Sequence, residues 1–206
     1  MTDTLHRILP QVQKPARYVG GEYNQIVKDK KNVDVRVAFC FPDTYEIGMS
    51  NIGMRILYGL MNEMPGVWCE RVFAPWGDME AEMRKYAIPL YALESHDPVK
   101  AFDLIAFTIG YEMSYTNILN MLELSCVPLL AREREGLENI VFAGGVCAVN
   151  PEPLADFIDF FSLGEGEEIT KEIIECYRQA KKDGCTKQEF LLRVSKIDGV
   201  YVPSFY

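Results

Sequence analysis

The sequence predicts an α/β fold, with helices on both faces of an open, mainly parallel five-stranded sheet. Three observations lead to this class. Five short apolar runs recur along the chain, segments of helical period separate them, and no apolar stretch approaches the ~20 residues of a transmembrane helix. Strands that alternate with helices are typical of parallel sheets built from right-handed β–α–β crossovers.

The first 31 residues are predicted to form an arm. Two prolines and a Gly-Gly pair interrupt any regular pattern, whereas Tyr18, Tyr23 and Ile26 supply side chains for packing. We therefore expect residues 1–31 to pack on a single α/β domain formed by residues 32–206.

The domain is expected to open with a buried strand over Val33–Phe41, which begins as alternation and ends as a continuous apolar run. Ser50 or Asn51 can cap a helix that continues to about Met64 with one apolar face. The same alternation then repeats. Further strands are predicted at Trp68–Phe73, Leu104–Ile109, Ile140–Ala143 and Phe160–Leu163, helices at Asp78–Tyr86, Tyr115–Leu124, Glu167–Lys182 and Lys187–Val194, and a short closing strand at Val200–Val202.

Composition excludes several classes of function. The formal net charge is −9, which argues against binding to nucleic-acid backbones or anionic membrane surfaces. The six cysteines show no CxxC or CxxxCxxC spacing and there are only two histidines, so no short segment supplies a zinc or iron–sulfur site. No signal-peptide pattern opens the chain, which indicates the cytoplasm.

Ligands of open parallel sheets bind outside the carboxyl ends of the strands. The first of these loops contains Asp43 and Gly48, and it is either a ligand loop or an ordinary turn in which Asp43 binds local amides. Gly144 and Gly145 likewise admit a flat ligand or simply another stretch of backbone. The loops to compare are Pro42–Gly48, Ala74–Gly77, Gly110–Ser114, Gly144–Asn150 and Gly164–Glu167.

The Gly164-Glu165-Gly166 loop resembles a phosphate loop in its glycines but not in its charge. Its carboxylates would repel a phosphate, and no basic residue follows before Lys171. Either these carboxylates only stabilise the helix N-terminus, or Glu165 accepts hydrogen bonds from the hydroxyls or amides of an uncharged ligand. No histidine lies in any strand-end loop to partner the carboxylates, so we expect no catalysis by this chain alone.

Several motifs, taken in order, resemble one family. They are the run from Pro15 to Asn24, FPDTYEIGMSNIG, CERVFAPWGDME, YEMSYTNILNML and FAGGVCAVNPEPLADFIDFFSLGEGEE. Together they resemble the N-terminal region of cobalamin-binding-type radical SAM proteins, a group of Fe–S oxidoreductases. The resemblance covers nearly the whole chain, and the ordered combination is specific although each motif alone is weak.

The resemblance implies a flavodoxin-like sheet, with strand order 2-1-3-4-5, that holds cobalamin ahead of a radical SAM barrel. In that family the barrel's CxxxCxxC motif binds a four-iron four-sulfur cluster that cleaves S-adenosylmethionine. Because the motif is missing here, we expect the cluster, S-adenosylmethionine and the barrel downstream of this chain or in a separate one. The Val200–Phe205 run resembles the lead-in to the barrel, which favours the first arrangement.

One departure concerns the cobalt ligand. The Asp-x-His-x-x-Gly motif of cobalamin-dependent methyltransferases reads Asp43-x-Tyr45-x-x-Gly48 here. A neutral phenol with a pKa near ~10 is a poor cobalt ligand, so we expect the lower face of the corrin to stay unligated. The cofactor-binding candidates implied by the resemblance are Asp43, Tyr45, Gly48, Thr108, Gly144, Gly145, Gly164, Glu165 and Gly166, with no catalytic residue and no metal ligand.

Three hypotheses for function follow. The chain is an accessory domain that positions a cofactor or substrate for a neighbouring barrel, or a docking module that retains the fold without the cofactor, or a flavodoxin-like nucleotide binder. The first two hypotheses predict different states of one feature of the fold, the space above the carboxyl ends of the strands. Cobalamin needs room above the sheet and a slot for its nucleotide tail, whereas bulky side chains in that slot would favour the docking module.

Overall fold

A six-stranded sheet organises the computed structural model, which describes residues 2–206. The strand order is β2-β1-β3-β4-β5-β6; the first five strands run parallel and β6 pairs antiparallel with β5. The predicted α/β class and the order 2-1-3-4-5 are therefore confirmed. The strands are β1 (Val35–Phe41), β2 (Val67–Phe73), β3 (Leu104–Thr108), β4 (Ile140–Gly144), β5 (Phe160–Ser162) and β6 (Val200–Tyr201).

The sixth strand is the difference from the predicted five-stranded sheet. The short closing strand predicted at Val200–Val202 turns back and pairs with β5. Gly199 permits the turn, since its φ is +86° and a Cβ there would lie 2.6 Å from the Leu163 carbonyl oxygen. Only glycine tolerates both conditions at once.

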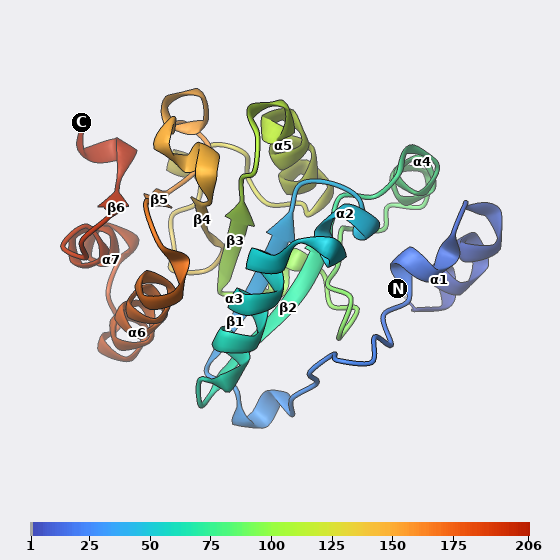
Figure 1. Ribbon diagram of the computed structural model, residues 1–206, viewed down its shortest axis with the longest axis horizontal. Coiled ribbons are helices and arrows are strands. Elements are labelled where there is room, and N and C mark those ends of the chain that lie inside the picture. Colours follow the sequence, from blue (N-terminus) through green and yellow to red (C-terminus); the bar gives the residue numbers. More distant parts are fainter. Residues whose placement is uncertain (1) are drawn as a thin grey trace.

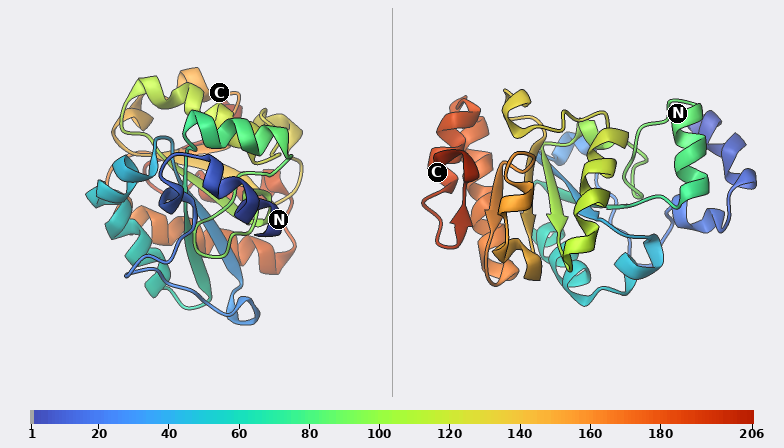
Figure 2. Two further views of the ribbon diagram at one scale, coloured as in Figure 1. Left: turned by 90° about the vertical axis from the view of Figure 1, so that its right-hand side faces the viewer. Right: turned by 90° about the horizontal axis from the view of Figure 1, so that it is seen from above.

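Helices cover both faces of the sheet (Figures 1 and 2). Residues of α3, α6 and α7 share one core cluster with one face, and residues of α1, α4 and α5 share a second cluster with the other. Two helices go beyond the sequence prediction: α1, which lies in the arm, and α2, which lies in the first strand-end loop. The helices are α1 (Thr2–Ile8), α2 (Tyr45–Ser50), α3 (Ile52–Glu63), α4 (Gly77–Lys85), α5 (Tyr115–Leu124), α6 (Gly166–Asp183) and α7 (Lys187–Val194).

The N-terminal arm adds side chains to the core. Leu5, Ile8 and Tyr18 are buried in the same cluster as α4 and α5. Farther along, the indole N–H of Trp68 donates to the Ile26 carbonyl oxygen at 2.9 Å, and the Ile26 N–H donates to the Tyr58 hydroxyl at 2.8 Å. The arm starts beside α4 and lies at the opposite end of the sheet from β6 (Figure 1).

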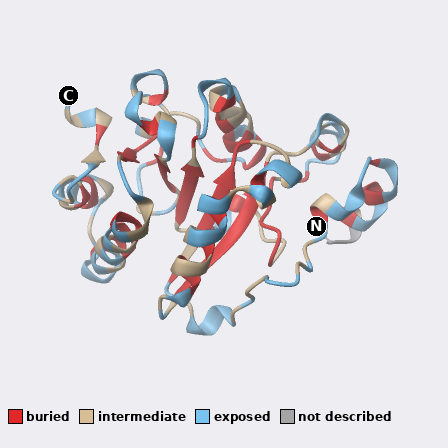
Figure 3. Ribbon diagram, viewed as in Figure 1, coloured by how far each residue is buried: buried red, intermediate tan, exposed pale blue. Residues whose placement is uncertain are grey.

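Both faces of the strands are buried, as expected for a parallel sheet between helix layers (Figure 3). On the face toward α3 and α6, the registers place Phe39, Ala106, Phe142 and Phe160 in one row across β1, β3, β4 and β5. The row has a single small residue, Ala106, between two large aromatic ones. Among residues 2–206, no helix has the length and the apolar character needed to span a bilayer.

Candidate functional site

A cavity of about 330 Å³ lies at the carboxyl ends of the central strands, between the sheet and helices α3 and α6. Three members of the row just described, Phe39, Ala106 and Phe142, form its floor, because Ala106 leaves a hollow between the two phenylalanines. The next inward-facing residues along β3 and β4 are Thr108 and Gly144, which are also smaller than the phenylalanines. The sheet itself thus creates the space, since small residues occupy its centre.

The first turns of α3 and α6 form the wall of the cavity. Asn51 caps α3, and its side chain accepts a hydrogen bond from the Met54 N–H at 2.8 Å. Gly53 and Leu57 follow on the cavity side, and Leu57 packs against the start of α6, where a Cβ on Gly166 would lie 3.2 Å from its Cδ1. A glycine at this point keeps the two helices close without filling the slot.

Glycines also form the rim. Gly145 has a φ of +102°, and a Cβ there would lie 2.8 Å from the Ile109 carbonyl oxygen, so the position requires glycine for both reasons. Gly164 has a φ of +100°, but a Cβ there would meet no atom within 4 Å, so only its backbone conformation favours glycine. Close backbone approach therefore explains Gly145, whereas a Cβ on Gly144 would lie 3.4 Å from the Ser162 carbonyl oxygen, and the space around Gly164 is open.

The polar side chains of the cavity are three hydroxyls, two carboxylates and the amide of Asn51, which caps α3. Thr108, Ser162 and Thr170 line it, and none of these hydroxyls has a hydrogen-bond partner within the described chain. Glu165 and Glu167 lie at the mouth, at the start of α6. No Lys, Arg or His is among the described residues that line the cavity.

Six of the nine residues proposed from the sequence gather in this cavity: Thr108, Gly144, Gly145, Gly164, Glu165 and Gly166. The other three, Asp43, Tyr45 and Gly48, do not line it. Gly48 is buried against the rings of Phe41 and Phe73, where a Cβ would come within 2.2 Å of the Phe73 ring. The packing of α2 on the sheet is a sufficient reason for this glycine.

Tyr45 is the first residue of α2, does not line the cavity and contacts the arm. Its hydroxyl hydrogen-bonds to Glu22, and its ring meets that of Phe73 edge-on with 5.6 Å between centroids. Burial, together with the Glu22 carboxylate, raises the pKa of Tyr45 to about 12. The phenol is therefore neutral near pH 7 and already has a partner.

Asp43 makes one local contact typical of an ordinary turn and one contact with a residue far away in the sequence. Its carboxylate accepts from the Thr44 N–H at 2.6 Å and from the Tyr111 hydroxyl at 2.7 Å. The second bond raises the pKa of Tyr111 and links the loops that follow β1 and β3. Asp43 thus holds the strand-end loops together.

Sequence reasoning missed the floor and the α3 wall. Phe39, Ala106, Phe142, Asn51 and Gly53 line the cavity, as do Leu57, Met61, Ser162 and Thr170. Ser162 ends the FFS strand two residues before Gly164 and could have been included on that ground. The floor residues carry no local signal, because their proximity depends on the register of three strands.

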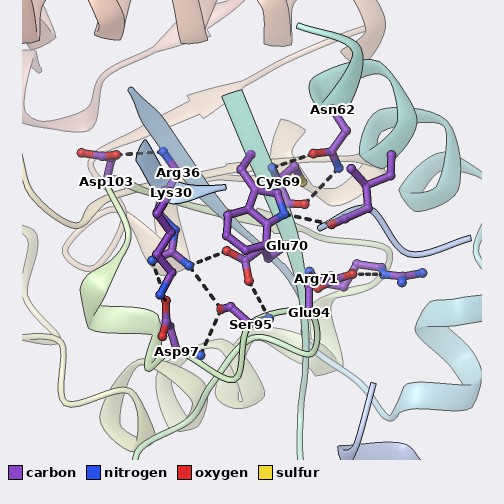
Figure 4. Close-up of polar contacts among 12 residues, drawn as sticks. Lys30, Arg36, Asn62, Cys69, Glu70, Arg71, Glu94, Ser95, Asp97 and Asp103 are labelled. Atoms are coloured by element: carbon purple, nitrogen blue, oxygen red, sulfur yellow. Dashed lines mark hydrogen bonds and ion pairs between the residues drawn. The ribbon is translucent and has the colours of Figure 1, made fainter. Parts of the chain in front are cut away.

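A second group of charged residues lies buried on β1 and β2 and forms no part of the cavity lining (Figure 4). Arg36 pairs with Glu70, which also accepts from the Ser95 N–H at 3.0 Å, and Arg71 pairs with Glu94 at 2.7 Å. Burial raises the pKa of both Glu70 and Glu94. These pairs attach the segment around residues 94–97 to the edge of the sheet, which is a structural role.

No group of three or more Cys, His, Asp or Glu side chains that could hold a metal ion occurs among the residues that the structure describes. The thiols are dispersed, and those of Cys40 and Cys69 are buried, which raises their pKa.

Comparison with known proteins shows which family the chain matches. Residues 53–203 match the family described as radical SAM proteins, N-terminal. The chain is also 26% identical over 142 residues to the uncharacterized protein MJ0966 of Methanocaldococcus jannaschii. The aligned segment covers 67% of this chain and 26% of that relative. The chain therefore spans about a quarter of the relative's length. No solved structure gives a significant match.

Proposed function

Because the chain belongs to the family of N-terminal domains of radical SAM proteins, we propose that it is an accessory domain whose α3–α6 cavity holds a ligand for a radical SAM catalytic domain. The catalytic domain would supply the iron–sulfur cluster and cleave S-adenosylmethionine. This domain would position a cofactor or substrate at the carboxyl edge of its sheet, where parallel sheets of this class bind ligands.

The observation that carries the proposal is the open slot. A fold retained only for docking has no reason to keep an unfilled cavity between two helices, since such a space forfeits contacts that a larger side chain would make. The volume of about 330 Å³ is at the lower end of the ~300–1,000 Å³ of ligand pockets. It suits one ring system with its substituents.

Cobalamin is the ligand that we propose for this slot. The aromatic floor of Phe39 and Phe142 and the glycine rim fit the ring of its nucleotide tail, and the strand-end loops would lie beneath the corrin. When bound, cobalamin supplies a cobalt centre for methyl or radical transfer. Tyr45 is turned to Glu22 and lies outside the cavity, so the chain would hold the cofactor by its tail and without a lower ligand.

A second candidate is a docking module without a cofactor. It is favoured by large apolar side chains exposed on two neighbouring loops of the same edge: Tyr111, Met113, Val146 and Val149 are 43%, 85%, 78% and 73% exposed. The Tyr115 hydroxyl joins these loops by hydrogen-bonding to the Cys147 carbonyl oxygen at 3.3 Å. An apolar surface of this kind fits a protein partner, and it is compatible with a ligand held beside it.

The test is a spectrophotometric titration of the chain with hydroxocobalamin, using two leucine substitutions on α3. Gly53→Leu places a side chain in the slot at a helical position with ordinary φ and no atom nearer than 3.4 Å. Gly59→Leu makes the same change on the same helix outside the slot, also without a close contact. Both replace glycine by a better helix former, so neither is expected to unfold the protein.

We expect hydroxocobalamin to bind the wild-type chain and the Gly59→Leu variant alike, and Gly53→Leu to weaken binding at least about tenfold, which is roughly 1.4 kcal/mol. Equal weakening by both variants would show that the slot is not the site. Absence of binding to the wild-type chain would reject cobalamin and favour the docking module.

A further inference from the structure

We propose that a small cavity between the arm, α2, α3 and β2 is a hydration site, in which one buried water accepts a hydrogen bond from Arg71 and links it to Tyr58 and Asn24. No residue lines both this cavity and the α3–α6 cavity, so the site is independent of any ligand held there. It gives a role to a buried charged group that the proposed function does not use.

The guanidinium of Arg71 is the first observation. The side chain is 4% exposed and pairs with Glu94, whose carboxylate accepts from Nε and from the backbone N–H of Arg71, both at 2.7 Å (Figure 4). Nη1 donates to the sulfur of Met49, a weak acceptor, at 3.4 Å. Nη2 has no hydrogen-bond partner among the described residues. Because a buried N–H left unpaired is costly, this nitrogen indicates an acceptor that the chain itself does not supply.

The cavity beside this group has the size of one water. Arg71 lines it together with Met49, Tyr58 and Asn24. Its volume is about 10 Å³, close to the ~10–15 Å³ that a single water requires. An organic ligand or a hydrated ion would not fit this space.

The lining also supplies the polar partners that a buried water needs. The Tyr58 hydroxyl accepts from the Ile26 N–H at 2.8 Å and can still donate its own proton. Burial raises the pKa of Tyr58, so the phenol keeps that proton near pH 7. The side chain of Asn24 offers a carbonyl oxygen as an acceptor. A water that accepts from Arg71 and Tyr58 and donates to Asn24 makes the roughly three hydrogen bonds that are typical of buried waters.

The balance of charge favours water over an anion. Glu94 already neutralises Arg71, and the other charged residue of the described lining, Arg55, is exposed to solvent. A halide in the cavity would add an unbalanced charge close to the buried carboxylate of Glu94. The protein interior disfavours such a charge, whereas a neutral water satisfies Nη2 without it.

The site contributes to holding the arm against the sheet. Over residues 22–28 the arm is attached by single side-chain bonds. The Trp68 indole donates to the Ile26 carbonyl oxygen at 2.9 Å, and the Lys28 ammonium donates to the Asn62 carbonyl oxygen at 2.6 Å. A water between Asn24 and Arg71 adds a further bond two residues before Ile26. The arm is therefore expected to loosen when Asn24 loses its amide.

The direct test is a crystal structure of the 206-residue chain grown with sodium bromide, at a resolution that shows ordered water. We expect one ordered water within hydrogen-bond distance of Arg71 Nη2 and no anomalous bromide signal at that position. An anomalous peak there would assign the site to an anion and overturn the proposal. An empty cavity, or a protein side chain bonded directly to Nη2, would overturn it as well.

Hydrogen exchange tests the link to the arm. Asn24→Ala removes the amide at the cavity, and Asn32→Ala makes the same change at an exposed position just after the arm and outside the cavity. We expect the Ile26 amide to exchange about three- to tenfold faster in Asn24→Ala, and at the wild-type rate in Asn32→Ala. Equal exchange in the two variants would contradict the bridge from Arg71 to the arm.

Discussion

Tyr45 illustrates how one residue can keep a motif's spacing and lose its chemistry. It lies between Asp43 and Gly48, where cobalamin-dependent methyltransferases carry histidine. In the fold its phenol hydrogen-bonds to Glu22 of the arm and packs edge-on against Phe73, which ends β2. The residue therefore connects the arm to α2 and the sheet, and Gly48 of the same segment packs against the rings of Phe41 and Phe73.

Substituting Tyr45 by phenylalanine separates these two roles. We expect Tyr45→Phe to leave the spectrum and affinity of bound hydroxocobalamin unchanged, because the side chain does not line the cavity. The free energy of unfolding should fall by about 1 kcal/mol, since the Glu22 carboxylate loses a hydrogen bond. Urea unfolding and difference absorbance measure the two effects. A change in the bound cofactor's spectrum would show that Tyr45 reaches the cobalt.

At the scale of elements, α3 forms one wall of the cavity and must be held at a fixed height on the sheet. Asn62, near its C-terminal end, is 7% exposed and reaches the edge strand β2. Its amide donates to the Cys69 carbonyl oxygen at 3.0 Å and accepts from the Cys69 N–H at 3.1 Å (Figure 4). One side chain thus satisfies two backbone groups of the edge strand, while Leu93 and Glu94 pair with the backbone of Arg71.

Removing this contact should be costly. We expect Asn62→Ala to lower the free energy of unfolding by about 2–3 kcal/mol, because the Cys69 N–H and C=O are left buried without partners. Asn120→Ala provides a control on α5, where the amide bonds only to the surface side chains of Glu80 and Arg84 and the cost should stay below about 1 kcal/mol. Equal losses in the two variants would show that α3 is not held through Asn62.

Periodicity predicted the elements of the sheet well, for a physical reason. The runs that become β3, β4 and β5 are continuously apolar or nearly so, as expected of strands buried between helix layers. The runs of β1 and β2 are apolar apart from Arg36, Glu70 and Arg71, which form ion pairs. The arm helix α1 was missed because it ends just before Leu9 and Pro10, in a region where proline signals irregular chain. Pairing of β6 was missed because two residues carry too little pattern to specify a partner.

The cavity was predictable only in part. Residues that are adjacent in the sequence could be selected from it, whereas residues that only the fold brings together could not. The rim residues of the glycine loops stand next to one another in the sequence, so Gly144, Gly145, Gly164 and Gly166 could be selected directly. The floor depends on Ala106 lying between residues 67 positions earlier and 36 later, which only strand order and register determine. Unpaired hydroxyls become visible only once hydrogen bonds are assigned.

At the scale of the whole molecule, the carboxyl edge of the sheet combines the α3–α6 cavity with exposed apolar loops. Val146 belongs to both, since it lines the cavity and is 78% exposed. Ligand and partner would therefore meet at one face, as expected for a domain that presents a bound group to a catalytic neighbour. The family match and the greater length of the relative from Methanocaldococcus jannaschii are consistent with such a neighbour.

The most direct measurement is mapping of backbone amide chemical shifts in the ¹⁵N-labelled chain as hydroxocobalamin is added. We expect the largest changes at the amides of Gly53, Gly110, Gly145, Gly164 and Gly166, which surround the cavity, and little change at Gly59, Gly136 and Gly184, which lie outside it. Changes that avoid the cavity glycines, or no saturable change at all, would contradict the assignment of this slot as the ligand site.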